Sequence, residues 1–149
     1  MSNVTGIDLT APVIARHEID IHAPLDLVWS LHVDVSAWPA WNPDITGVTV
    51  EQPLAPGVSF RWHTAGLSIL STVHALAERE RILWGGTVAG ITGLHEWTFT
   101  ETTEGVRVAT EESWSGEPVT ANVADMQTGL DQSLVSWLSH LKSAAEARI

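Results

Sequence analysis

Hydrophobic and polar residues alternate along VIARHEIDIHA, residues 13–23. One face of this stretch carries Val13, Ala15, His17, Ile19 and Ile21. Alternation with a period of two is the pattern of a strand with one buried face and one wet face. The sequence therefore predicts a first strand whose apolar face meets the core.

The period changes after this strand. Pro24 suits the first position of a helix, and helical spacing then continues to about Val33 through Leu25, Val28, Trp29 and His32. A second short helical segment is predicted around 36–41, because Pro43 and the residue before it resist helical geometry. We therefore expect two short helices after the first strand.

Six further strands are predicted between residues 45 and 115. They cover Gly47–Glu51, Val58–Thr64, Ser68–Glu78, Arg81–Val88, Gly93–Thr102 and Val106–Ser115. The connections between them are short and contain turn-forming residues such as Pro56-Gly57. Short connections favour an antiparallel meander over parallel strands joined by helices.

The last segment, Thr120–Arg148, has the period of an amphipathic helix. Its apolar stripe consists of Val123, Met126, Leu130, Leu134, Trp137, Leu138, Leu141 and Ala145. A curved sheet cannot bury its apolar face alone, so this helix is expected to lie across it and to leave a cavity beneath. We predict an α+β fold with a curved seven-stranded antiparallel sheet wrapped around a long C-terminal helix. Residues 1–12 are expected to be a flexible leader and residues 13–149 a single domain.

Charge and composition exclude several classes of function. Seven Lys and Arg stand against eighteen Asp and Glu, for a formal net charge of −11. Such a chain repels phosphate backbones and anionic lipid, so we expect no nucleic-acid partner and no membrane partner. The absence of cysteine excludes disulfides, thiolate zinc sites and cysteine nucleophiles. The sequence shows no secretory signal and no apolar run long enough to span a membrane, so we expect a cytoplasmic protein.

Metal binding is not indicated by the histidines. The seven of them show no HxH, HxxxH or HExxH spacing, so we predict no metal and no cofactor. A metal site assembled from distant strands stays open as an alternative. The aromatic composition is more distinctive, with eight Trp, two Phe and no Tyr. Several tryptophans around a cavity would suit a flat apolar ligand, and the alternative is a core built from tryptophan.

Five stretches carry a resemblance to a known family. They are IDIHAPLDLVWSLHVDVSAWPAWNPDI (19–45), PGVSF (56–60), RILWGG (81–86), GLHEWTFTETTEGVRVATEESWSG (93–116) and LSHLKSAAE (138–146). With the order of the elements, they resemble the START-like or SRPBCC superfamily, in particular its polyketide cyclase/dehydrase group. The resemblance covers about residues 13–147 and implies a helix-grip fold with a cavity for a small hydrophobic ligand. It does not fix the activity, because this fold hosts carriers, receptors, lyases and cyclases alike.

The stretch WPAWNPDI (38–45) has two interpretations. In members of the superfamily the bend after the first helices lies beside the cavity mouth, so Trp38 and Trp41 would form a rim or lid positioned by the two prolines. Alternatively, they close one end of the core where helices meet the sheet.

Strand parity selects the candidate chemistry. Glu112 shares the apolar face of residues 106–114 with Thr110 and Trp114, and His95 shares a face with Trp97 and Phe99. If both faces point inward, a carboxyl and an imidazole lie in one dry chamber, where they could exchange a proton near neutral pH. Cyclisation and dehydration of a poly-β-ketone need a base and an acid, and we assign these roles to Glu112 and His95. The alternative is a structural carboxylate and a hydrogen-bonded core histidine.

Further residues are candidates for binding the ligand. They are Trp38, Trp41, Trp62, Trp97, Phe99, Thr110, Trp114, His17, Met126 and Leu130. Together with the resemblance, they predict a protein that binds a polyketide-like or aromatic molecule in an internal cavity, and they leave open whether it catalyses the cyclisation or dehydration of that molecule. The alternatives are a non-catalytic carrier or sensor of such a ligand and a co-chaperone-type interaction module. An enzyme is expected to place two titratable groups on facing walls of the pocket, and a carrier one or none. A homodimer is compatible with the tryptophan-rich edges.

Overall fold

Seven strands form one sheet in the order β1-β7-β6-β5-β4-β3-β2 in the computed structural model, which describes residues 4–149. Every neighbouring pair is antiparallel. The strands are β1 (Val13–Ile21), β2 (Ile45–Thr49), β3 (Ser59–Thr64), β4 (Leu67–Ala77), β5 (Arg81–Val88), β6 (Ile91–Thr102) and β7 (Gly105–Ser115). The predicted seven-stranded antiparallel sheet is therefore confirmed.

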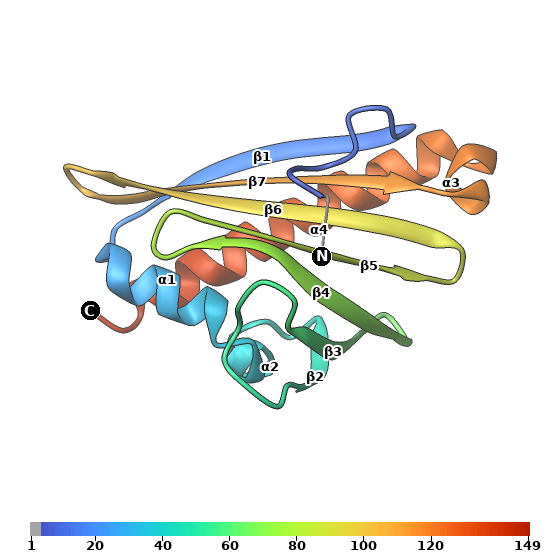
Figure 1. Cartoon of the computed structure of the whole chain (residues 1–149). Helices are drawn as coiled ribbons and strands as arrows, with labels where there is room; N and C mark the ends of the chain where they lie inside the picture. The colour runs from blue at the N-terminus through green and yellow to red at the C-terminus, as the bar shows by residue number, and fades with distance from the viewer. Residues whose placement is uncertain (1–3) are drawn as a thin grey trace.

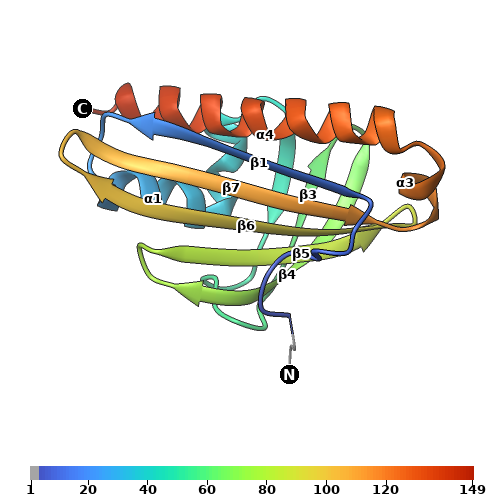
Figure 2. The ribbon, with the colours of Figure 1, turned by 90° about the horizontal axis from the view of Figure 1, so that it is seen from above.

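Helices cover one face of this sheet and both of its ends. The first group follows β1 and comprises α1 (Leu25–Val33), the 3₁₀ helix η1 (Val35–Ala37) and α2 (Trp38–Trp41). The second group follows β7 and comprises α3 (Glu117–Ala121) and α4 (Val123–Glu146). The sheet curves along α4, with α1 at one end of the molecule and α3 at the other (Figures 1 and 2). This arrangement is the predicted helix-grip fold.

The C-terminal helical region differs in detail from its prediction. A single helix over Thr120–Arg148 was expected, with Thr120 or Asn122 as its cap. The structure has a separate α3 that ends at Ala121, and Asn122, with φ −142° and ψ 50°, is the N-cap of α4. The apolar stripe of α4 lies in the core from Leu130 onward, whereas Val123 is 41% exposed. The long helix thus covers the sheet with its later turns, and its first turn lies near the surface.

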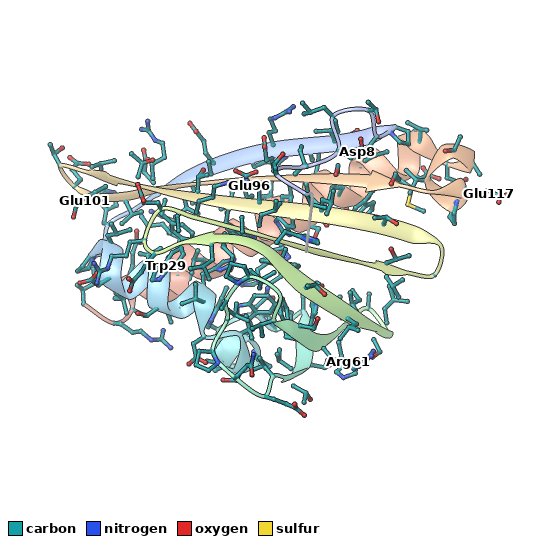
Figure 3. All side chains as sticks on the ribbon, in the orientation of Figure 1. Asp8, Trp29, Arg61, Glu96, Glu101 and Glu117 are labelled. Atoms are coloured by element: carbon teal, nitrogen blue, oxygen red, sulfur yellow. The ribbon has the colours of Figure 1, made fainter. Side chains whose placement is uncertain are left out.

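The segment before β1 lies against the outer face of the sheet. Ile7 is buried there, the Arg81 guanidinium donates to the Thr5 carbonyl oxygen at 2.6 Å, and the backbone N–H of Asp8 donates to Ser113 Oγ at 2.9 Å. Asp8 is labelled in Figure 3. Residues 1–3 of the expected leader lie outside the described residues, and the flexibility of the leader stays a prediction.

Candidate functional site

A cavity of about 300 Å³ lies between the sheet and α4. Its walls come from β3 to β7 and from α4, and four tryptophans contribute to them: Trp62, Trp84, Trp114 and Trp137. Lining residues at the β3–β4 turn and at the β5–β6 turn, such as Ala65 and Ile91, place the cavity toward the end of the molecule that carries α3 (Figure 1). The space is mostly apolar, and its only titratable side chains among the described residues are His95 and Glu112.

The register of the sheet brings His95 and Glu112 together. His95 on β6 lies directly opposite Glu112 on β7, and Trp84 on β5 lies opposite His95 on its other side. Successive side chains of a strand point to opposite faces, and these three all line the cavity. His95 is 2% exposed and the Glu112 side chain 15%, so both are largely removed from solvent.

Hydrogen bonds fix the direction of the protons around this pair. The Thr110 hydroxyl donates to the Glu96 carbonyl oxygen at 3.1 Å. A hydroxyl has one proton to donate, so Thr110 Oγ1 accepts the proton of His95 Nε2, which lies 2.7 Å away. The neutral imidazole then offers Nδ1 as an acceptor to Glu112 Oε1, at 3.2 Å. With a neutral imidazole, this contact favours a protonated Glu112.

The electrostatics of the site agree with that assignment. Burial raises the pKa of Glu112 to about 8, against the opposing effect of the hydrogen bond from the Trp114 indole. Burial, and after it the neighbouring His32, lower the pKa of His95 well below its ordinary value. A charged form is disfavoured wherever solvent is removed. Burial therefore favours the neutral forms of both groups at neutral pH, a carboxylic acid in contact with a neutral imidazole.

Trp114 orients the second oxygen of Glu112. Its indole N–H donates to Glu112 Oε2 at 2.9 Å. Gly93, opposite Trp114 in the sheet, leaves the room for this contact. A Cβ atom at position 93 would lie 3.2 Å from Glu112 Oε2 and 3.4 Å from Trp114 Cδ1, both closer than ordinary van der Waals contact. The missing side chain keeps this oxygen clear on the cavity side of β6.

The structure brings four of the predicted site residues to the cavity wall and leaves the others outside it. Glu112, His95, Trp62 and Trp114 line the cavity. Among the rest, Thr110 is hydrogen-bonded to His95 Nε2 without lining the cavity. Trp97 and Phe99 are buried on the same face of β6 as His95. His17 is hydrogen-bonded to Asp131 at 2.7 Å, and Met126 and Leu130 belong to a separate apolar cluster with Val13.

Trp38 and Trp41 lie in the core and not at the cavity mouth. Trp38 is 0% exposed and its indole N–H donates to the His32 carbonyl oxygen at 2.8 Å. Its ring centroid lies 4.9 Å from that of Trp137 and 5.5 Å from that of Phe60. This placement matches the second interpretation of WPAWNPDI, in which both tryptophans close one end of the core. They belong to the packed part of the core between the sheet and α4, outside the cavity.

The predicted set lacked most of the residues that line the cavity, among them Trp84, Trp137 and Ser133. Trp84 alternates with Ile82 in RILWGG and thus had the signal of an inward position. Trp137 belongs to the apolar stripe of α4, which already indicated that it faces the sheet. Ser133, which also lines the cavity, is polar and carried no sequence signal.

His32 on α1 is the least satisfied polar side chain next to this site. It is 0% exposed, neither ring nitrogen has a hydrogen-bond partner among the described residues, and its ring centroid lies 4.5 Å from that of Trp97. Burial lowers its pKa from 6.5 to about 3. The fold therefore holds His32 neutral over the range in which the unfolded chain would protonate it.

Acid is expected to destabilise the protein through His32. A histidine with a lowered pKa contributes stability that is present above pH 6.5 and is lost as the pH falls toward 3. At about 1.4 kcal/mol per pH unit, acidification from pH 7 to pH 4 should cost about 3 kcal/mol through this residue. Urea unfolding at both pH values should show that His32→Leu loses less stability than the wild type by this amount. His22→Gln, at an exposed histidine, is the control, and parallel losses in wild type and His32→Leu would contradict the assignment.

Residues 4–149 contain no group of three or more His, Asp or Glu side chains placed to hold a metal ion. No helix within the same residues is long and apolar enough to cross a membrane.

The fold and the cavity define a helix-grip protein with an internal chamber. The chain belongs to the family described as polyketide cyclase / dehydrase and lipid transport, which residues 12–146 match. This family and the structural neighbours confirm the predicted START-like membership. No match was found among curated protein sequences.

Solved structures share this fold at low sequence identity. Hypothetical protein jhp0584 of Helicobacter pylori is 17% identical with a TM-score of 0.81, over 97% of this chain and 99% of that one. The Zhui aromatase/cyclase of Streptomyces sp. R1128 is 19% identical with a TM-score of 0.77, over 91% and 94%. The di-domain ARO/CYC StfQ of the steffimycin biosynthetic pathway is 17% identical with a TM-score of 0.75, over 91% of this chain and 51% of that one. At these identities the likeness concerns the fold.

Proposed function

We propose that this protein binds a small aromatic or polyketide-like molecule in the cavity beneath α4, and that Glu112 and His95 catalyse proton transfers on it. The observation that carries the proposal is the close approach of a carboxyl and an imidazole, 3.2 Å between Glu112 Oε1 and His95 Nδ1, in the wall of an otherwise apolar chamber. Family membership and the aromatase/cyclase neighbours support it. The cavity volume of about 300 Å³ equals that of roughly ten water molecules at ~30 Å³ each. It suits a molecule of one or two rings.

The geometry suggests how the pair would act as a base. Glu112 Oε2 accepts a proton from an acidic C–H of the ligand, while Oε1 passes its own proton to His95 Nδ1. The carboxyl stays neutral, the imidazole becomes an imidazolium, and the ligand becomes an enolate. The reverse transfer returns a proton to carbon, or to an oxygen that leaves as water in a dehydration. The hydrogen bond from Trp114 to Oε2 and that from His95 to Thr110 hold the relay in line.

One observation favours the alternative of a non-catalytic carrier or sensor. The two titratable groups lie side by side on adjacent strands and not on facing walls. Each polar atom of the pair also has a partner within the chain: Thr110 and Glu112 for His95, and His95 and Trp114 for Glu112. A carrier would use such a satisfied pair to specify its pocket and would leave the ligand unchanged.

Hydrogen–deuterium exchange on a two-ring ketone separates these functions. The α-hydrogens of 2-tetralone exchange with D₂O through the enolate, so NMR reports proton abstraction without knowledge of the natural substrate. If the pair is catalytic, the wild type should accelerate exchange and Glu112→Gln should reduce the acceleration by about 100-fold or more, the usual contribution of a positioned acid–base group. Binding of 2-tetralone without faster exchange would favour the carrier.

A matched pair of variants tests whether the exchange takes place in the cavity. Ser133 lines the cavity from α4, whereas Ser139 is exposed on the same helix. Ser133→Phe should abolish both binding and exchange because its ring fills the chamber, and Ser139→Phe should leave both unchanged. Exchange that survives in Ser133→Phe would exclude this cavity as the site.

A further inference from the structure

Every lysine and arginine of the chain is engaged outside the cavity. There are seven of them, and five pair with carboxylates: Arg16 with Glu111, Arg79 with Asp26, Arg81 with Glu96, Arg107 with Asp20 and Lys142 with Glu146. The other two donate to uncharged oxygens, Arg61 to Ser68 Oγ and Arg148 to the Ala144 carbonyl. Arg61 lies on β3, next to the edge strand β2 (Figure 3). None of the seven lines the cavity.

The cavity itself offers no positive charge at neutral pH. His95 is neutral there because burial lowers its pKa, and its Nδ1 is taken by Glu112. The remaining polar groups in the wall are uncharged: the hydroxyls of Thr64, Ser71 and Ser133 and the indole N–H groups of the four tryptophans. An anion placed in this chamber would lose its hydration without gaining a counter-ion, which is among the most costly transfers in proteins.

A bound anion would also act on Glu112. A negative charge next to a carboxyl opposes its ionisation, so the anion and an ionised Glu112 disfavour each other. The net charge of −11 for the whole chain adds a repulsive field at the approach to the mouth. The lack of positive charge in the cavity, the Glu112 carboxyl in its wall and the negative charge of the whole chain therefore all disfavour the binding of an anion.

We propose that the cavity selects electrically neutral ring molecules and rejects carboxylates and phosphates of the same shape. This proposal rests on the proposed binding function and narrows its ligand class. It excludes fatty acids and other free acids as ligands in their ionised form. It favours ketones, phenols and esters, whose oxygens can meet the Glu112 carboxyl without bringing a charge.

Three probes of nearly the same shape test this selection. At pH 7, 2-naphthol and methyl 2-naphthoate are neutral, whereas 2-naphthoate is an anion. We expect quenching of the intrinsic tryptophan fluorescence to give dissociation constants for the two neutral probes that are at least about 100-fold lower than that for 2-naphthoate, because the anion finds no counter-ion. Isothermal titration calorimetry provides a readout that does not depend on probe absorbance.

The outcomes separate this proposal from the proposed function. If 2-naphthoate binds as tightly as the neutral probes, charge selection is wrong while binding in the cavity stands. If none of the three binds, both proposals fail. Ser133→Phe should abolish the binding of the neutral probes, and binding that persists in this variant would place them elsewhere and overturn the selection by this chamber.

A charge added at the mouth gives a second test. Leu67 lines the cavity on β4 and is 39% exposed, and Leu70 on the opposite face of the same strand is 47% exposed. Leu67→Lys should tighten the binding of 2-naphthoate severalfold relative to that of 2-naphthol at low salt, and this gain should be lost as salt is added. Leu70→Lys should have no effect on either probe. Equal behaviour of the two lysine variants would overturn the proposal that missing positive charge excludes anions.

Discussion

Replacing Trp38 with alanine is expected to lower the free energy of unfolding by about 3–5 kcal/mol, the range for removing a fully buried tryptophan ring. Trp38 is 0% exposed and its ring lies within 6 Å of those of Trp62, Trp84 and Trp137. These neighbours are held by strands and by α4, so they cannot collapse into the space that the ring leaves. The substitution also removes the hydrogen bond to the His32 carbonyl oxygen.

Urea unfolding followed by circular dichroism measures this loss without relying on tryptophan emission. Trp38→Phe is the matched control because it keeps an aromatic ring in the same space and should recover part of the stability. A loss below about 1 kcal/mol for Trp38→Ala would show that the ring does not fill the core. A folded Trp38→Ala protein should also have a longer chamber and accept larger ring ligands than the wild type.

Replacing Glu112 with glutamine is expected to favour the folded state more at alkaline pH than at acidic pH. The free energy of unfolding of Glu112→Gln, relative to that of the wild type, should rise by about 4 kcal/mol between pH 5 and pH 9. The pKa of Glu112 rises from 4.5 to about 8 on folding. A raised pKa means that the fold favours the protonated form. The stability it contributes is therefore complete below pH 4.5 and is lost as the pH rises through 8. Glutamine cannot ionise, so it avoids that loss.

The same substitution tests the position of the proton. The amide introduced by Glu112→Gln would donate to His95 Nδ1 and its oxygen would accept from Trp114, as the neutral acid does. Wild type and Glu112→Gln should thus have similar stability near pH 5 and diverge by pH 9. Glu111→Gln, which alters the neighbouring carboxylate on the outer face, is the control and should show no such divergence. A wild-type protein that is the more stable of the two at pH 9 would mean that Glu112 is ionised in the fold.

Local sequence patterns predicted the fold closely because this architecture depends on them. Alternation placed the strand over 13–23 at Val13–Ile21, and turn residues placed the strand over 81–88 at β5 itself. The 3.6-residue period found α4, and Asn122 was a candidate for its cap, but local sequence did not predict the separate α3, which contacts β6 and β7. Packing between distant elements overrides local preference at such positions.

The sequence predicted the site only as far as the alternation of side chains along a strand shows which of them face the cavity. Parity placed Glu112 and His95 on the concave face, but it did not show that they are direct neighbours across two strands. Pairing requires the register, which the sequence of either strand alone does not contain. The same limit applies to Trp114 lying over Gly93. The sequence could not decide whether Trp38 lies at the cavity mouth or in the core. That depends on how closely α2 packs on the sheet, which is set by all the aromatic rings between them.

Native mass spectrometry of the freshly purified protein, with extraction and identification of what it carries, tests the central claim most directly. We predict a neutral molecule of one or two rings bound to the wild type and absent from Ser133→Phe, with the neutral naphthalene probes taken up in its place after extraction. A bare protein that takes up none of these probes would contradict the claim. The fold would then serve an interaction module, with the chamber as a feature of its packing.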